Sequence, residues 1–583
     1  MVLATLKGMN AGRPRPPHRI GVWIAGCLLL GTLAGAAAEP PIRYTVTPIL
    51  ERDSLAALAI EVRFTGEADG ETQLELPDTW GGESELYRGI RDLTIAGGHA
   101  TLADGDRPAA RTIRHAPGAA LTVRYRVVQF WEGAPTIRGR NEYRPVIQPG
   151  YFHVIGHAVF VRPAAGNSAP ASFEMKGLPS GWRFASDLEH QHADRPLMLG
   201  DVFQSIMVGG DYRVVTRGKL RVAFIGTWRF QDQAFIDRLQ PIVASHQRFF
   251  GDPDEPFLVT VLPLKGSEGQ ISIGGTGLDD AFAFFASANA ADSTLTRTLA
   301  HEHLHTWIPR RIGRMPMRDE ASDYWLSEGF TDFYTFRLLV RAGFWSVDQY
   351  AAEASDALRT YATSSVRTAP NARVVAEFWK SPEMQKVPYQ RGFLLASLWD
   401  ARLQAATKGA RDLDDVILAM RADARADTHT MMASHLFAKH MGRFGVDVTD
   451  DIARYIERGE AIVLPADLYG PGARIVTTEM PEFSRGFDIE KTSASGNVVT
   501  GLDPDSPAYR AGLRDGMKIL ARTSGRTGDS RVPLTYRVQD GDAERVITYA
   551  PEGRRRVTLQ ELVLDPALDE DGRRALAKRL GGE

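Results

Sequence analysis

Two histidines and two glutamates near the middle of the chain have the residue types and the spacing of a metal site. His301 and His305 lie four residues apart in the segment HEHLH, which reads as part of a helix, so both imidazoles project from one face and can bind one Zn²⁺. Glu302 is offset by one position, where its carboxylate can reach a metal-bound water without binding the metal. Glu328, in a second expected helix over 322–340, would be the third protein ligand. Because open catalytic zinc sites commonly use two histidines and one glutamate, the pattern predicts a hydrolytic zinc centre.

Two other polar side chains lie close to this motif in the sequence. Asp332 comes four residues after Glu328 on the same face of the expected helix, so it is placed to accept the outer N–H of a ligand histidine. His303 lies two residues from each ligand histidine and points away from their face, which favours a packing or substrate-side role. The alternative is an amphipathic helix with solvated carboxylates, and the complete set of two histidines and two glutamates weighs against it.

Composition limits what else the chain can be. Its 583 residues suggest three to four domains, and 43% hydrophobic with 24% charged residues is an ordinary globular mixture. The formal net charge of −3 lacks the basic excess of nucleic-acid binders, so we expect no nucleic-acid partner. The single cysteine excludes an intrachain disulfide and a cysteine-based zinc site. Any metal must therefore be held by His, Asp and Glu.

The first 38 residues have the layout of a secretory signal. Basic residues without acidic ones come first, an apolar run covers 20–38, and the alanines at 36–38 fit a small-residue cleavage site. We therefore expect an exported protein, periplasmic or secreted, whose mature chain begins at Glu39. Two alternatives stay open: an uncleaved membrane anchor, and a lipoprotein in which Cys27 carries the lipid.

Hydrophobic periodicity divides the rest of the chain into regions of different secondary structure. Residues 42–215 show short alternating runs separated by turn residues, which predicts a β-sandwich-like domain without convincing helices. Long helical patterns dominate 292–459, and a Pro/Gly-rich joint at 464–474 precedes a segment of short strands. The individual elements expected are strands over 58–64, 121–128, 157–163, 220–226 and 256–264, and helices over 232–250 and 570–580.

Several motifs resemble those of a known peptidase family. The segments HEHLHTW and YWLSEGFTDFY look like the gluzincin metallopeptidases, and specifically like the glycyl aminopeptidase (M61) family. LELPDTWGG over 74–82 looks like the family's N-terminal Leu-Pro-x-Trp signature, and YQRG over 389–392, before an expected helix, looks like its Tyr-x-Lys-Gly segment. The resemblance implies that Tyr389 donates a hydrogen bond to the tetrahedral oxyanion, a suitable role for a neutral phenol beside zinc.

The resemblance also implies a multidomain α+β fold. The family's order is an N-terminal β domain, a thermolysin-like zincin catalytic domain with a helical region, and a C-terminal PDZ domain. The implied boundaries are a signal peptide at 1–38, an N-terminal β domain at 39–215, a gluzincin catalytic domain with helical region at 216–475, a PDZ domain at 476–566 and a helical tail at 567–583.

One stretch departs from the family pattern. The family carries Gly-Gly-Leu-Glu-His before the zinc helix, with the glutamate expected near the free amine of the substrate. This chain has Asp279 and Asp280 at the last two positions. Gly277 and Asp279 are therefore the candidate substrate-binding residues, and Asp279 keeps the negative charge with a shorter reach. Aminopeptidase action on peptide N-termini and endopeptidase action by the same centre both stay open.

The C-terminal segment resembles a PDZ domain. Residues 501–516 look like the pattern SPAxxAGLxxGD. The resemblance implies a loop whose backbone N–H groups receive a peptide carboxylate, beside a strand edge for β-augmentation. The candidate peptide-binding residues of that loop are Gly486, Phe487, Asp488 and Ile489.

We interpret the chain as an exported zinc metallopeptidase with one Zn²⁺ per chain, an aminopeptidase acting on peptide or protein substrates. A C-terminal peptide is the expected further ligand of the PDZ domain, and membrane contact is expected only from an anchored or lipidated N-terminus. A non-catalytic PDZ-containing binding protein with a vestigial metal site is the alternative from another functional class. The complete zinc motif weighs against that alternative, because a degenerate site would most readily lose Glu302.

Overall fold

The computed structural model describes residues 42–582, apart from residues 138, 140, 190–195, 254, 267–270, 291, 317–318 and 427–430. The predicted signal segment and its alternatives, including Cys27, lie outside the described residues. Among the helices described, none combines the length and the apolarity needed to cross a bilayer.

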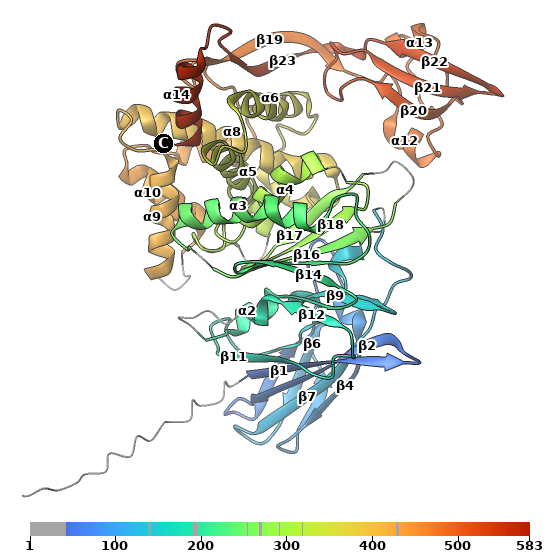
Figure 1. The fold of residues 1–583 in the computed structure, drawn as a ribbon, viewed down its shortest axis with the longest axis vertical. Coiled ribbons are helices and arrows are strands. Elements are labelled where there is room, and N and C mark those ends of the chain that lie inside the picture. The colour runs from blue at the N-terminus through green and yellow to red at the C-terminus, as the bar shows by residue number, and fades with distance from the viewer. Residues whose placement is uncertain are drawn as a thin grey trace, which may run out of the picture. The chain divides into compact units, whose positions relative to one another are not determined.

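Three β-sheets form the N-terminal part of the described chain (Figure 1). Their strands are β1 Ile42–Glu51, β2 Ser54–Thr65, β3 Glu71–Glu75, β4 Ile90–Ala96, β5 Thr101–Asp104, β6 Ala110–Arg114, β7 Ala120–Val127, β8 Val146–Gln148, β9 Tyr151–Ile155, β10 Arg162–Pro163, β11 Ala171–Met175, β12 Arg183–Ser186 and β13 Ile206–Gly210. The strand orders are β11-β1-β2-β7-β4, β10-β3-β6-β5 and β12-β13-β9-β8. Buried residues alternate along β1 and β7 because one face of their sheet packs into the core. The predicted strands at 58–64 and 121–128 are confirmed.

The predicted strand over 157–163 is wrong. The chain forms a short helix there, α1 Gly156–Val159, followed by β10. The run is apolar because Ala158 and Val159 are buried, but a short apolar run does not distinguish a buried strand from a buried helical turn. Gly156 lets the turn pack on the backbone of α2, Leu199–Phe203, since a Cβ at Gly156 would lie 2.2 Å from the carbonyl oxygen of Val202.

A five-stranded sheet carries one side of the candidate site. Its strands are β14 Arg213–Arg217, β15 Leu220–Phe224, β16 Phe257–Leu264, β17 Ile273–Gly277 and β18 Ala281–Ser287, in the order β14-β15-β16-β18-β17. β15, β16 and β18 are parallel, and β17 pairs antiparallel with β18 at the edge. Helix α3, Asp232–Phe250, joins β15 to β16 and confirms the predicted helix over 232–250 (Figure 1). This sheet begins at Arg213, within the segment assigned above to the N-terminal domain.

Helices follow the sheet and form a large aromatic and aliphatic core. Their bounds are α4 Asp292–Leu304, α5 Tyr324–Arg341, α6 Val347–Thr363, α7 Asn371–Glu377, α8 Pro382–Ala406, α9 Leu413–Ala426 and α10 Ala433–Arg443. Helices α5 and α8 approach each other closely at Gly329 and Gly392. A Cβ on Gly392 would lie 1.8 Å from the carbonyl oxygen of Trp325, so only glycine permits this crossing.

The C-terminal segment combines a long two-stranded ribbon with a small sheet (Figure 1). The ribbon pairs β19 Ala473–Phe483 with β23 Glu552–Leu564, and β23 packs on α6. The small sheet contains β20 Lys518–Ser524, β21 Leu534–Asp540 and β22 Ala543–Tyr549. Three helices complete the segment: α12 Ile489–Ala494, α13 Pro507–Arg510 and α14 Glu570–Gly581, the last confirming the predicted terminal helix.

The loop at 486–489 leads directly into a helix. Gly486 has a positive φ of 80°, and Phe487 packs edge-on against Tyr536, as a compact loop requires. Asp488 then caps α12, its side chain accepting a hydrogen bond from the backbone N–H of Lys491 at 3.0 Å. Ile489 starts this helix and is exposed. The aspartate cap therefore turns the chain into a helix directly after the loop, and β-augmentation beside the loop stays a prediction.

Candidate metal centre

The three predicted metal ligands come together where α4 packs against α5. His301 lies on α4, His305 directly follows the end of α4, and Glu328 lies on α5. One nitrogen or oxygen atom from each lies within 4.8 Å of the others. Glu328 Oε2 is 3.3 Å from His301 Nε2 and 3.4 Å from His305 Nε2. Two imidazole nitrogens and one carboxylate oxygen thus surround a single point.

The outer nitrogens of both imidazoles are held by hydrogen-bond acceptors. His305 Nδ1 donates to the backbone carbonyl of Ile308 at 2.9 Å, and His301 Nδ1 lies 3.0 Å from Asp332 Oδ1. A carbonyl only accepts, so His305 has a proton on Nδ1, and its Nε2 faces the centre. Asp332 lies behind the ligand histidine His301, as its spacing predicts, and its contact with Nδ1 turns Nε2 of His301 toward the centre.

The carboxylates around the centre make it attractive to a cation. Burial disfavours the charged form of His301, but its contacts with Asp332 and Glu328 outweigh burial and raise its pKa to about 10. Burial also opposes the ionisation of Glu328, yet the two ligand histidines bring the pKa of Glu328 well below its ordinary value. Asp332 behaves likewise: Arg297 and His301 overcome burial and lower its pKa. Both carboxylates therefore stay ionised at neutral pH.

Glu302 and Gly277 lie beside the ligand set. Glu302 is half-buried, and burial raises its pKa above the ordinary value although the two ligand histidines oppose this. The backbone of Gly277 hydrogen-bonds the Glu302 carboxylate. A Cβ on Gly277 would lie 2.8 Å from the backbone oxygen of Glu302, so the missing side chain lets the end of β17 touch α4.

Tyr389 reaches the centre from α8. The sequence predicts a helix that begins after Tyr389, whereas α8 begins at Pro382 and continues through Pro388. The close crossing of α5 and α8 holds this part of the chain helical despite the proline. The Tyr389 ring stacks on His301 with 5.8 Å between ring centres, and its hydroxyl hydrogen-bonds Glu328. Burial and the neighbouring carboxylates hold the pKa of Tyr389 well above its usual range, so the phenol remains a donor.

The two aspartates after β17 are paired with arginines. Arg310 Nε lies 3.6 Å from Asp279 Oδ1, and Arg311 Nη2 donates to Asp280 Oδ1 at 2.7 Å. Burial raises the pKa of Asp279, and Arg310 opposes that rise. The candidate cradle for a substrate amine therefore carries its own cations, which motif comparison alone does not reveal.

His303 points away from the ligands, as its spacing predicts. Its ring is buried, and its Nδ1 lies 3.0 Å from Nδ1 of His246. It also packs edge-on against Phe257 and Trp307. Burial lowers the pKa of His303 well below its ordinary value, so it is a neutral core residue.

Sequence reasoning missed Arg297 and Glu353. Arg297 donates to Asp332 Oδ2 at 3.2 Å and to Glu353 Oε2 at 3.0 Å. Arg297 is four residues before His301, and this spacing could have identified it as a residue of the same helix face. Glu353 carries no comparable signal, because it comes from another helix.

The donor set fits a zinc ion. Two imidazoles and one carboxylate suit a borderline-soft divalent cation, and three protein ligands leave a fourth position for water or substrate. Both histidines also have the outer hydrogen bonds that metal-ligating imidazoles require.

The residues around this centre match the model of a known family. Residues 294–387 match the model of the M61 glycyl aminopeptidase family, a range that contains the three ligands and Asp332 and ends just before Tyr389. A search of the curated proteins gives no match.

One of the solved structures compared with this chain has a similar fold. An aminopeptidase N family protein from Idiomarina loihiensis has a TM-score of 0.64 at 15% identity, covering 92% of this chain and 100% of that chain. An M1 zinc metallopeptidase from Deinococcus radiodurans has a TM-score of 0.46 at 16% identity, covering 73% of this chain and 94% of that chain. Native yeast LTA4 hydrolase has a TM-score of 0.46 at 13% identity, covering 73% of this chain and 68% of that chain. The family match covers the two helices that supply the ligands, so the region around this centre, residues 294–387, is similar to the M61 glycyl aminopeptidase family of peptidases.

Proposed function

We propose that this chain is a zinc-dependent metallopeptidase, an aminopeptidase that hydrolyses bonds at peptide N-termini. The observation that carries the proposal is the set of three donor atoms within 4.8 Å of one another, with Glu302 and Tyr389 beside them. The match to a peptidase family supports hydrolysis of peptide bonds. Held by His301, His305 and Glu328, zinc supplies Lewis acidity that polarises a carbonyl and makes water easier to deprotonate.

The side chains around the ligands have the chemistry that peptide hydrolysis needs. Edge strand β17 ends against α4, so an extended substrate can lie along it with the scissile carbonyl near the ligands. Glu302 takes a proton from the attacking water and passes it to the leaving amine, and its raised pKa brings it closer to neutral pH. Tyr389 stays neutral and donates its O–H to the oxyanion.

A zinc endopeptidase with the same centre is the second candidate, and one observation favours it. An aminopeptidase needs an anionic group for the substrate ammonium, but Asp279 and Asp280 already pair with Arg310 and Arg311. An ion pair of this kind reduces the negative potential that would recognise a free amine. An endopeptidase has no such requirement.

One assay on matched peptides separates these functions. Cleavage of a peptide with a free N-terminus should stop when the metal is chelated, return when zinc is added, and fail on the same peptide after N-acetylation. Equal cleavage of the acetylated peptide would replace the aminopeptidase by the endopeptidase. A wild-type protein that binds zinc but cleaves neither peptide would contradict both and favour a binding role.

We also propose export of the chain and a PDZ-like fold for residues 476–566. The basic and apolar N-terminal sequence supports export, and the SPAxxAGLxxGD-like pattern supports the second assignment. Sequencing the N-terminus of the protein recovered from outside the cytoplasm tests export, and a start at Glu39 is the expected result.

A further inference from the structure

Arg297 connects the metal ligands to helix α6, which the proposed mechanism does not use. Its Nη2 lies 3.2 Å from Asp332 Oδ2 on α5, and its Nη1 lies 3.0 Å from Glu353 Oε2 on α6. The guanidinium carbon also lies 5.0 Å from the centre of the Phe336 ring. Arg297 is therefore held on three sides, by two carboxylates and one aromatic face.

This arrangement engages both oxygens of Asp332. Asp332 Oδ1 accepts a hydrogen bond from His301 Nδ1, and Asp332 Oδ2 accepts one from Arg297. With both oxygens bound, the carboxylate cannot rotate about its own axis without breaking a charge-assisted hydrogen bond. The orientation of the His301 ring follows from the plane of that carboxylate.

Resting on the zinc centre proposed above, we propose that Arg297 is a positioning residue of the metal site. It fixes the carboxylate of Asp332, which in turn aligns His301 with the other ligands. Glu353 holds Arg297 in this geometry. The position of α6, which carries Glu353, therefore helps to fix the orientation of the His301 ligand.

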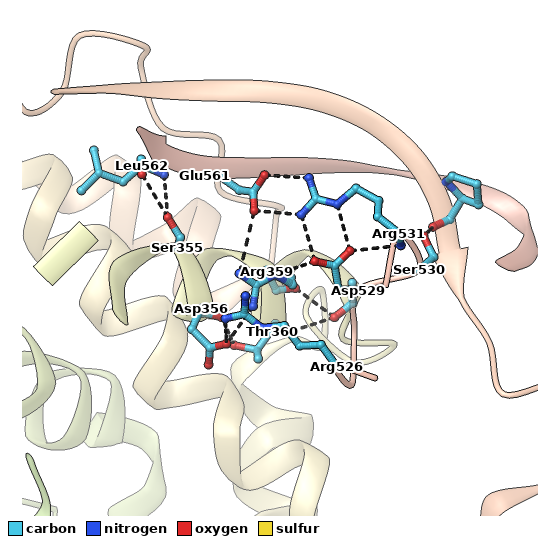
Figure 2. A network of polar contacts seen from close by, with 12 residues as sticks. Ser355, Asp356, Arg359, Thr360, Arg526, Asp529, Ser530, Arg531, Glu561 and Leu562 are labelled. Atoms are coloured by element: carbon cyan, nitrogen blue, oxygen red, sulfur yellow. Dashed lines mark hydrogen bonds and ion pairs between the residues drawn. The ribbon is translucent and has the colours of Figure 1, made fainter. Parts of the chain in front are cut away.

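The C-terminal segment fixes another part of α6, as Figure 2 shows. Ser355 Oγ accepts a hydrogen bond from the backbone N–H of Leu562 at 2.9 Å and donates to its carbonyl at 3.2 Å. Two residues before Ser355 on α6 stands Glu353, the partner of Arg297. Strand β23 of the ribbon therefore binds α6 at the helical turn that contains Glu353, the ion-pair partner of Arg297.

A cluster of four charged residues also joins α6 to the C-terminal segment (Figure 2). Arg359 of α6, only 2% exposed, lies 3.7 Å from Asp529 and 3.8 Å from Glu561. Arg531 bridges the same two carboxylates at 2.9 Å and 2.8 Å. Arg359 and Asp529 are buried charges of opposite sign, and they hold a fixed geometry because removing one leaves its partner uncompensated. The C-terminal segment therefore acts on the metal site through α6.

The first test measures zinc affinity in the full-length protein by competition with a chromogenic chelator. Arg297→Gln should raise the zinc dissociation constant about tenfold. Loss of a residue that supports a metal ligand typically weakens metal binding about 10- to 100-fold, and Arg297 acts on the ligand only through Asp332. Glu353→Gln should raise it about threefold, as expected for a partly exposed ion pair. Arg297→Lys, which keeps the charge, should recover part of the loss.

Asp348→Asn is the matched control for Glu353→Gln. Asp348 is also an acidic residue of α6 in an ion pair, but its partner is Arg573 of α14. This control should bind zinc like the wild type. If the variants change only thermal stability and all bind zinc with equal affinity, Arg297 stabilises the fold but does not orient the metal ligands. That result would overturn the inference.

The second test is a double-mutant cycle on zinc affinity between Arg531→Gln and Glu353→Gln. Arg531→Gln should weaken zinc binding in the wild-type background and have less effect once Glu353 is changed, because both act through α6. Arg537→Gln is the control, since Arg537 pairs with Glu544 inside the C-terminal segment. Additive effects in the cycle would overturn the part assigned to the C-terminal segment.

Failure of the proposed function gives a different result from failure of this inference. A wild-type protein without zinc affinity would contradict the proposed metallopeptidase and the inference together. Tight zinc binding that is insensitive to Arg297 and Glu353 would contradict the inference alone.

Discussion

Gly329 of α5 and Gly392 of α8 lie backbone against backbone. A Cβ on Gly329 would stand 2.3 Å from the Cα of Gly392, which is closer than real side chains come. This contact sets the distance between the helix that carries Glu328 and the helix that carries Tyr389. Two residues without side chains thus bring a metal ligand and the proposed oxyanion donor together.

We expect Gly392→Ala to force the two helices apart. The added methyl would lie 1.8 Å from the carbonyl oxygen of Trp325, and overpacking of this kind costs about 1–3 kcal/mol of stability. Peptidase activity should fall further than stability explains, because Tyr389 moves away from Glu328. Urea denaturation with parallel measurement of kcat checks both effects.

Gly442→Ala is the control for that variant. Gly442 lies in α10 and has nothing within 4 Å of the added Cβ, so alanine should stabilise the protein by up to about 1 kcal/mol. If Gly392→Ala and Gly442→Ala changed stability and activity equally, the packing of α5 against α8 would not require a glycine at position 392.

Glu302→Gln should abolish turnover while zinc stays bound. The amide fills the same space but cannot accept the proton of water, and loss of general-base catalysis lowers kcat about 100- to 10,000-fold. Metal analysis of the purified variant and the rate on the unblocked peptide provide the measurements. Substantial activity in this variant would assign the base to another residue.

Tyr389→Phe should lower kcat and leave KM nearly unchanged. The phenol donates to charge that develops only in the transition state, and removal of one such donor costs about 100- to 1,000-fold. The ring should still stack on His301, so zinc affinity and folding stability should be close to wild type. A rise in KM at constant kcat would instead indicate that Tyr389 binds substrate.

Zinc affinity should weaken as the pH falls. Nearby carboxylates raise the pKa of His301 to about 10, so its imidazole is protonated at neutral pH, whereas zinc requires the neutral form. Each proton displaced makes the apparent dissociation constant rise about tenfold for every pH unit lost. Titration calorimetry in buffers of different ionisation enthalpy counts the protons released. Zinc binding without proton release would show that His301 is already neutral.

Much of the metal centre could be predicted from local sequence. A helical spacing of four residues places His301 of α4 and His305, directly after its end, on one face whatever surrounds the helix, and Glu328 and Asp332 obey the same rule on α5. The same reasoning identified the exclusion of His303 from the ligand set. Helix α3 and the strands at 58–64, 121–128, 220–226 and 256–264 were also predictable, because their hydrophobic periods are regular.

Other features depend on segments that are distant in sequence. The pairing of Asp279 with Arg310 and the placement of Glu353 against Arg297 join residues from different elements, and no local period encodes such pairs. One short segment was also misread, since the apolar run at 157–163 fits more than one backbone conformation. The sequence by itself thus determined which side chains can hold a metal and on which helix faces they lie, because helical geometry is local.

Only the tertiary structure decided how α4 and α5 meet, that Tyr389 and Arg297 lie beside the ligand set, and where α6 is anchored. These contacts join distant segments, and local sequence preferences do not distinguish them from other possible contacts.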